Sequence, residues 1–338
     1  MRRLLLTLLL FGCTGSDPPA DDDDSAGSVE VPANLVEAVC GADELPASAE
    51  NSLPSTPLPG ASLDCTGAGC TLALPAEVQT RSYGPLRAAE RSLVVGGWET
   101  DELILARPDG VELLDRGDRY SFAVDDESLW LVEGVQLLQV GAAGAIRRRC
   151  GLPDEEGGWD YRVEAAAGGL FVLGQRAEVP RARMWRATLS GWEEVVVEAA
   201  PDRVVAHDDE TFFLLGYGYY HMYSPASGTI EQWGGSDDDF SAVAVCADRT
   251  YWIGGMTGMT LYCSPEHVCG ERLDHYPFQS ASLWCNDEGD LEFLTSEDGD
   301  VSVLSADNVL ETRPRPTGLR LFLSDQGRRY EVVTAGVP

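Results

Sequence analysis

The chain has 338 residues, with 24 basic and 56 acidic side chains and a formal net charge of −32. Every basic residue is arginine. Such a surface repels phosphate backbones and anionic lipid headgroups, so the composition argues against nucleic acid as a partner. A hydrophobic fraction of 44% is sufficient for a folded core.

The first residues are typical of an export signal. Arg2 and Arg3 precede an apolar run over residues 4–11, which is too short to span a bilayer. The next motif, Leu10-Phe11-Gly12-Cys13, resembles the lipobox of bacterial lipoproteins. The resemblance implies cleavage before Cys13, its lipidation, and a membrane partner at that residue. Because Thr14 rather than Asp follows, it also implies the outer membrane of a Gram-negative cell envelope. An ordinary secretory signal, with Cys13 incidental, is the alternative.

Composition divides the remaining chain into two parts. Residues 13–60 are rich in Asp, Ser, Pro, Ala and Glu, which predicts a disordered tether between the signal peptide (1–12) and a folded domain (61–338). The Asp21–Asp24 run is interpreted as a self-repelling spacer, with calcium binding as the alternative. Residues 34–42 are expected to form a short helix or strand that Cys40 fixes to the domain.

A short apolar strand ending near glycine recurs through the domain. Subtracting successive starting positions gives spacings of 36 to 42 residues, typical of propeller blades. Each repeat contains four short strands divided by Gly, Pro, Asp and Ser, so the fold class is all-β. The prediction is a seven-bladed β-propeller, with a six-bladed ring as the alternative. The copies begin at Leu93, Leu129, Leu170, Phe212, Tyr251, Leu291 and Tyr330.

The last repeat ends after its second strand, at residues 330–333. A hairpin near the start of the domain supplies the missing pair. Its halves, 62–65 and 70–74, are expected to be the third and fourth strands of the final blade. Strands from both termini would then close the ring and remove an exposed sheet edge.

Eight cysteines remain after Cys13, an even number that fits an oxidising compartment. Two pairs flank matching hairpin turns, and one pair follows by elimination. Cys246 and Cys285 end corresponding strands of adjacent repeats, where they either pair or remain buried thiols. The predicted disulfides are Cys65–Cys70, Cys263–Cys269 and, by elimination, Cys40–Cys150.

The loops at the two ends of the strands differ in character. Turns between first and second strands are acidic, as at residues 125–127 and 208–210, and either attract a basic partner or simply face water. The opposite end is rich in aromatic residues, including Trp159, and is the predicted recognition surface, although packing between blades is the alternative. The candidate ligand-binding residues there are Trp98, Tyr217, Tyr219, Tyr220, His221 and Tyr276.

Catalytic signals are weak. The four histidines show no metal-ligand spacing, and neither a nucleophile elbow nor a phosphate-binding loop is present. No catalytic residue, metal or cofactor is therefore predicted. The sequence favours an exported binding or scaffold module for protein, peptide or glycan. The alternative is an envelope hydrolase or lyase at the channel mouth, which His221 with converging carboxylates would favour.

Overall fold

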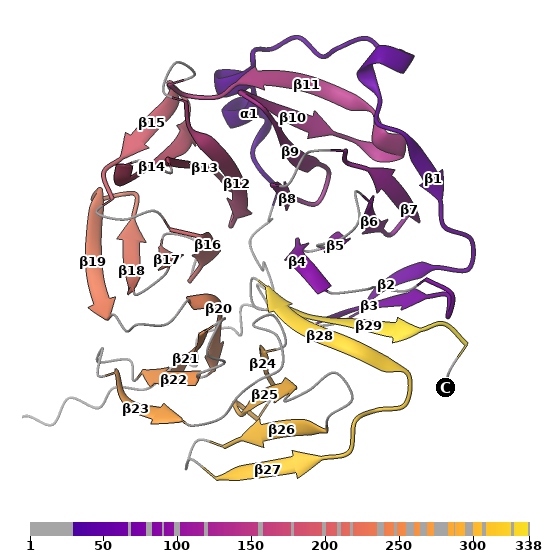
Figure 1. Ribbon diagram of the computed structural model, residues 1–338, viewed down its shortest axis with the longest axis vertical. Helices are drawn as coiled ribbons and strands as arrows, with labels where there is room; N and C mark the ends of the chain where they lie inside the picture. Colours follow the sequence, from indigo (N-terminus) through magenta and orange to yellow (C-terminus); the bar gives the residue numbers. More distant parts are fainter. Residues whose placement is uncertain are drawn as a thin grey trace, which may run out of the picture.

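The computed structural model shows seven sheets arranged around a central axis within the residues that it describes (Figure 1). Those residues are 30–66, 69–78, 83–89, 91–97, 102–117, 121–154, 158–176, 179–197, 201–207, 211–216, 219–234, 240–246, 249–254, 260–263, 269–273, 283–286, 288–294, 300–305, 309–325 and 328–336. The predicted seven-bladed propeller is confirmed.

Blades 1 to 6 are antiparallel sheets whose strands follow the chain from the innermost strand outward. Blade 1 contains β4 (Tyr83–Ala88), β5 (Leu93–Gly97), β6 (Glu102–Arg107) and β7 (Gly110–Asp115). Blade 2 contains β8 (Phe122–Val124), β9 (Leu129–Glu133), β10 (Gln136–Val140) and β11 (Ile146–Gly151), with η2 (Ala142–Gly144) between the last two. Blade 3 contains β12 (Asp160–Ala166), β13 (Gly169–Arg176), β14 (Val179–Thr188) and β15 (Gly191–Val195).

The next three blades repeat the pattern. Blade 4 contains β16 (Arg203–Ala206), β17 (Phe212–Gly216), β18 (Tyr219–Ser224) and β19 (Thr229–Gly234). Blade 5 contains β20 (Phe240–Cys246), β21 (Arg249–Gly254), β22 (Thr260–Cys263) and β23 (Cys269–Leu273). Blade 6 contains β24 (Leu283–Cys285), β25 (Leu291–Leu294), β26 (Val301–Leu304) and β27 (Leu310–Arg313).

Blade 7 closes the ring with strands from both termini, as predicted. Its order is β2 (Ser62–Thr66), β3 (Gly69–Leu74), β29 (Arg328–Thr334) and β28 (Leu319–Asp325), so the purple β2 and β3 lie beside the yellow β29 and β28 in Figure 1. The expected strand order within the hairpin is wrong. Strand β3 occupies the third position and pairs parallel to β29, while β2 is outermost.

The parallel pairing has a topological reason. In blades 1 to 6 each strand runs antiparallel to its neighbour, so the fourth strand runs in the direction of the second and leads to the next blade. Because β3 is parallel to β29, it has that direction and can lead to β4 from the third position. The side chain of Arg320 in β28 strengthens the closure: its guanidinium donates to the carbonyl oxygens of Val78 (2.7 Å) and Pro75 (3.0 Å).

The core lies between blades. In β13, Leu170 and Val172 pack in a cluster with residues of blade 2, while Phe171 and Leu173 pack in a cluster with residues of blade 4. All four side chains are buried because both faces of the sheet are covered. This explains why the recurring strand is apolar at consecutive positions rather than at alternate ones. The repeated strand is therefore scaffold.

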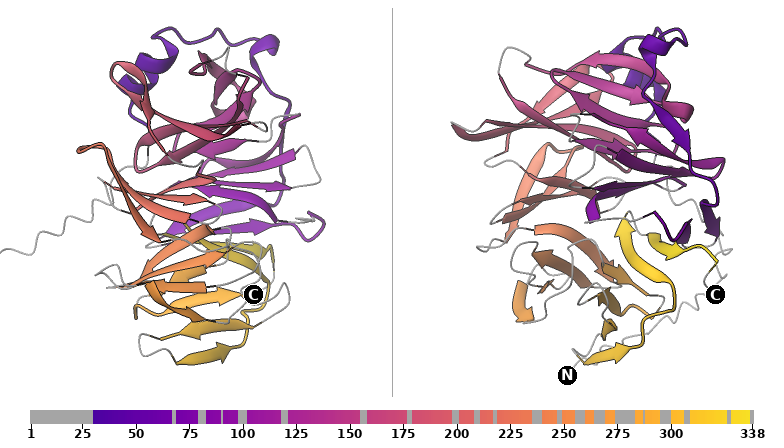
Figure 2. Two further views of the ribbon diagram at one scale, coloured as in Figure 1. Left: turned by 60° about the vertical axis from the view of Figure 1, so that its left-hand side comes forward. Right: turned by 45° about the vertical axis from the view of Figure 1, so that its right-hand side comes forward.

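Residues 31–58 form an outer belt around blades 1 to 3 (Figure 2). The belt contains α1 (Ala33–Cys40), which contacts β11, β14 and β15, then η1 (Ala49–Asn51) and β1 (Ser55–Pro57), which pairs with β7. Of the two alternatives expected near Cys40, a short helix or a strand, the structure shows the helix. The tether predicted over 13–60 is wrong for residues 30–60, because buried Val36 and Leu53 fix this polar segment to blades that already have cores. Residues 13–29 lie outside the described part.

The disulfides follow the predicted pattern where the structure describes them. Cys65–Cys70 joins β2 to β3, and Cys40–Cys150 joins α1 to β11. Cys285 is also disulfide-bonded, and its partner lies outside the described side chains. Cys263 and Cys269 are directly opposite in the β22–β23 register, but their side chains are not described; nor is that of Cys246. These disulfides indicate an extracytoplasmic protein.

Candidate binding site at the end of blade 3

The predicted ligand-binding residues do not form a surface cluster in the described part of the chain. Trp98, Tyr217 and Tyr276 lie outside it, as does Cys13, and Tyr219 is described only as the first residue of β18. Tyr220 and His221 are only 1% and 7% exposed. Their assignment to an exposed loop is wrong.

The error concerns the position at which β18 begins. Residues 217–218 alone separate β17 from β18, so the aromatic run belongs mostly to a strand. Tyr220 then packs in the core with Phe213 and Leu215, and burial raises the pKa of its phenol to about 12. Its register partner is Leu215, and His221 is opposite Leu214. Both side chains therefore belong to the scaffold.

The β13–β14 hairpin extends beyond the regular blade pattern. Its strands have 8 and 10 residues, longer than the other strands in the described part of the chain. Their register shifts between Gly174 and Arg176, which marks a β-bulge near the tip. Bulges bend a strand and redirect side chains, and they are common near functional sites. We call the group of Asp154, Trp159, Arg176 and Arg183 at this end the blade 3 rim.

Aromatic packing positions the rim. Trp159, just before β12, meets Trp185 edge-to-face with ring centroids 6.0 Å apart, and Tyr161 contacts the same ring at 6.1 Å. The Tyr161 hydroxyl donates to the carbonyl oxygens of Pro153 (2.5 Å) and Asp154 (3.0 Å). The half-buried Trp159 therefore stands on a fixed aromatic base.

Gly174 provides room for this base. A Cβ atom at this position would lie 2.8 Å from Trp185 Cζ3 and 3.3 Å from Trp159 Cδ2. Any larger residue would displace one of the two rings. The glycine that ends the recurring apolar strand in this blade thus allows both indoles to cross the backbone.

Two guanidinium groups lie over the Trp159 ring. The Cζ atom of Arg176 is 4.3 Å and that of Arg183 is 5.3 Å from the ring centroid, within cation–π range. Arg183 is also paired with carboxylates: Nη1 lies 3.1 Å from Asp154 Oδ2, and Nε lies 3.3 Å from Glu194 Oε1. The Trp159 indole donates to the same Asp154 oxygen at 2.9 Å. No ion pair joins Arg176 to another described residue.

The acidic turns at the opposite end behave differently. Asp125, which follows β8, is 2% exposed, and its carboxylate accepts from the backbone amides of Glu127 (2.9 Å) and Ser128 (2.6 Å) and from the Trp130 indole (2.8 Å). Burial nevertheless raises its pKa to about 6, outweighing these hydrogen bonds, which favour the charged form. This acidic residue stabilises a turn and is not part of an open cation-attracting ring.

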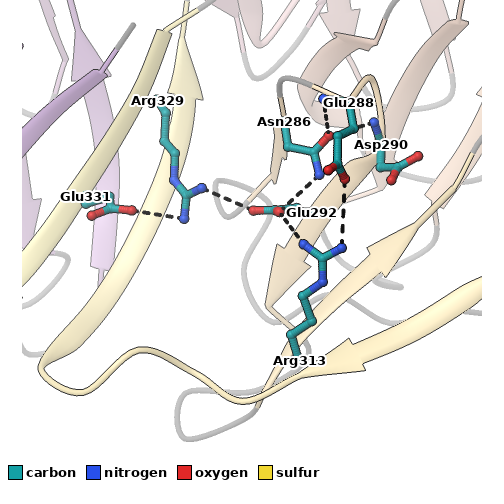
Figure 3. A network of polar contacts seen from close by, with 7 residues as sticks. All are labelled: Asn286, Glu288, Asp290, Glu292, Arg313, Arg329 and Glu331. Atoms are coloured by element: carbon teal, nitrogen blue, oxygen red, sulfur yellow. Dashed lines mark hydrogen bonds and ion pairs between the residues drawn. The ribbon is translucent and has the colours of Figure 1, made fainter. Parts of the chain in front are cut away.

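A second polar network, centred on the buried Glu292, links blades 6 and 7 (Figure 3). Glu292 of β25 accepts from Asn286 Nδ2 at 3.2 Å and lies 3.1 Å from Arg329 of β29 and 3.6 Å from Arg313 of β27. Asn286 Oδ1 accepts from the amides of Glu288 and Asp290. Asn286 and Glu292 are thus bonded within the fold.

The innermost strands contain a polar pair that was not expected from the sequence. Arg87 Nη2 lies 2.6 Å from Glu164 Oε1, which joins the innermost strands of blades 1 and 3 on either side of blade 2. The Glu164 side chain is 2% exposed. The only signal in the sequence is that a charged residue stands within β4, at Arg87, and within β12, at Glu164. Its buried carboxylate has no access to a dissolved substrate.

No group of three His, Cys, Asp or Glu side chains within the described residues has the geometry to hold a metal ion. No helix in this part of the chain combines the length and apolarity required to cross a bilayer.

Comparison with solved structures shows a β-propeller fold. Virginiamycin B lyase from Staphylococcus aureus aligns with a TM-score of 0.51 and 12% identity, over 76% of this chain and 96% of that one. The dihydro-heme d1 dehydrogenase NirN gives 0.52 and 10%, over 86% and 69%. The Dos1 propeller gives 0.51 and 9%, over 86% and 92%. No protein-family model and no curated protein matches the sequence.

Proposed function

We propose that this chain is an exported, lipid-anchored β-propeller that acts as a binding or scaffold module for protein, peptide or glycan at the outer membrane. The disulfides support export. The Leu10-Phe11-Gly12-Cys13 motif supports anchoring through Cys13.

The observation that carries the binding function is the blade 3 rim. An indole on a fixed aromatic base carries an arginine whose guanidinium is not neutralised within the described chain. Tryptophan and arginine are the side chains that most often dominate recognition surfaces. Asp125 and Glu292 are also held in place by several polar contacts, but they are buried in the scaffold.

Binding is tested by the capture of cell-envelope material on the purified full chain. We expect a component that is retained by the wild type and by Arg186→Gln, but lost with Trp159→Ala. Arg186 is a matched control because it lies on β14 and is already paired with Glu193 at 3.3 Å. Equal retention by Trp159→Ala, with its melting temperature unchanged, would place recognition away from the rim.

Anchoring has a separate test. We expect Cys13→Ser to leave the signal peptide uncleaved and to abolish labelling by a radioactive fatty acid in a Gram-negative host. After detergent extraction of the cells, the wild-type and Cys13→Ser proteins should be found in different fractions. Normal cleavage and unchanged membrane fractionation of Cys13→Ser would support an ordinary secretory signal instead.

The enzyme alternative receives no support from the residue on which it depended. His221 is buried in β18 and does not stand at a channel mouth. Virginiamycin B lyase and a dehydrogenase are among the matched propellers, but at 10–12% identity this likeness concerns the fold alone. One propeller fold hosts many unrelated functions.

A further inference from the structure

Most of the arginines that the structure describes have a carboxylate partner. Arg87, Arg162 and Arg329 each lie within 3.1 Å of one. Such pairing is expected in a chain with 56 acidic and 24 basic residues. Arg176 differs, because no ion pair joins it to another described residue. Its guanidinium instead makes a cation–π contact with the Trp159 ring.

Stacking fixes the plane of a guanidinium without using its donors. The five N–H groups of arginine point outward in that plane, whereas the cation–π contact uses the flat face. Trp159 is itself held by Trp185 and by a hydrogen bond to Asp154. The Arg176 donors are therefore pre-oriented, which lowers the entropy cost of binding a ligand.

The local charge also differs from that of the whole chain. Residues 175–186 contain four arginines and one glutamate, a net charge of +3 by subtraction, in a chain of −32. Arg183 is balanced by Asp154 and Glu194. Because guanidiniums already lie over the Trp159 ring, a cationic ligand has no attractive contact to gain there. A planar fork of donors instead fits a carboxylate or phosphate group.

We propose that the Arg176 guanidinium, stacked on Trp159, binds the oxyanion group of the ligand, a carboxylate or a phosphate. This inference rests on the proposed binding function of the blade 3 rim. The negative field of the whole chain opposes the approach of an anion, but it is screened within about 8 Å at physiological ionic strength. Arg176 then provides specificity at short range.

The test follows the indole N–H signals of the eight tryptophans by NMR in the full chain. Loss of a signal in Trp159→Phe assigns Trp159. The titrants are glucuronate for the carboxylate, glucose 6-phosphate for the phosphate, and glucose as the neutral reference, all at fixed ionic strength. We expect a saturable shift of the Trp159 signal with at least one charged sugar and none with glucose.

Matched variants decide whether Arg176 is the receptor. Arg176→Gln should weaken binding at least tenfold without changing the melting temperature, and Arg186→Gln should bind as the wild type does. Equal binding by Arg176→Gln, equal shifts with glucose, or no response to either charged sugar would overturn the inference. If envelope capture still depends on Trp159 in that case, the binding function remains and only the assigned ligand chemistry is lost.

Discussion

The two ends of the strands use polar side chains in different ways. At the turns between first and second strands, Asp125 and Asn286 are bonded to backbone amides and to a side chain of the following strand. At the blade 3 rim, Arg176 lies on an indole with its donors unused by the described chain. Saturated polar groups stabilise a scaffold, whereas unsaturated ones at a surface are available to a ligand. The comparison therefore supports a structural role for the two turns and is consistent with the proposed binding role of the blade 3 rim.

The turns also differ from one another in an instructive way. Asp125 accepts from the Trp130 indole, while Asn286 donates to Glu292. In these two blades the residue after the first strand bonds to the second residue of the following strand, with donor and acceptor exchanged. Blades 2 and 6 thus stabilise corresponding turns with different pairs of side chains.

The largest expected effect is at the pair between the innermost strands of blades 1 and 3. Glu164→Gln removes the buried carboxylate that lies 2.6 Å from the Arg87 guanidinium, so the free energy of unfolding should fall by about 3–5 kcal/mol. Glu193→Gln is the control, since its pair with Arg186 is exposed and should contribute about 0–1 kcal/mol. Urea denaturation measures both. Similar losses of unfolding free energy in the two variants would contradict a special structural role for the Arg87–Glu164 pair.

The Asp125 turn predicts a pH dependence. Its pKa is about 6 in the folded chain and 3.8 in the reference state, so the folded chain binds more protons between these values. Stability from this group is therefore complete below about pH 4 and falls by up to about 3 kcal/mol as pH rises through 6. Urea denaturation at several pH values should show this slope in the difference between wild type and Asp125→Asn. A difference independent of pH would contradict the raised pKa.

Exchanging the partner chemistry should break the blade 6 turn. Asn286→Asp places a carboxylate where an amide donates to Glu292 at 3.2 Å, which should cost about 1–3 kcal/mol. The control is Asn51→Asp, because the Asn51 amide donates to Pro46 at an exposed position. Thermal unfolding compares the two. A loss no greater than that of the control would mean that the network is not important for stability.

A substitution at Gly174 should mainly change the position of the aromatic rings at the blade 3 rim. Gly174→Ala brings a Cβ atom against Trp185, which should cost about 1–2 kcal/mol and move the Trp159 indole signal in NMR spectra. Gly110→Ala is the control, since an added Cβ there meets nothing within 4 Å. An unchanged Trp159 signal in Gly174→Ala would show that the glycine does not position the rim.

Local pattern was sufficient for the strands but insufficient for the rim. The seven recurring strands were predicted because apolar runs and turn residues are properties of neighbours in sequence. Tyr220 was misassigned because the same pattern leaves open where β18 begins. The belt was missed for a related reason: its few apolar residues are insufficient for a core of their own, and Val36 is buried only by blades 2 and 3.

The sequence by itself determined the number of blades, the closure by both termini, the Cys65–Cys70 disulfide from the repeat pattern, and the Cys40–Cys150 disulfide by elimination. Only the tertiary structure decided that Arg87 meets Glu164, that β3 runs parallel to β29, and that Arg176 rests on Trp159. The physical reason is the separation along the chain between the residues that make contact. Apolar periodicity arises from contacts that every blade repeats, whereas these pairings depend on how differently shaped blades twist and bulge where they meet.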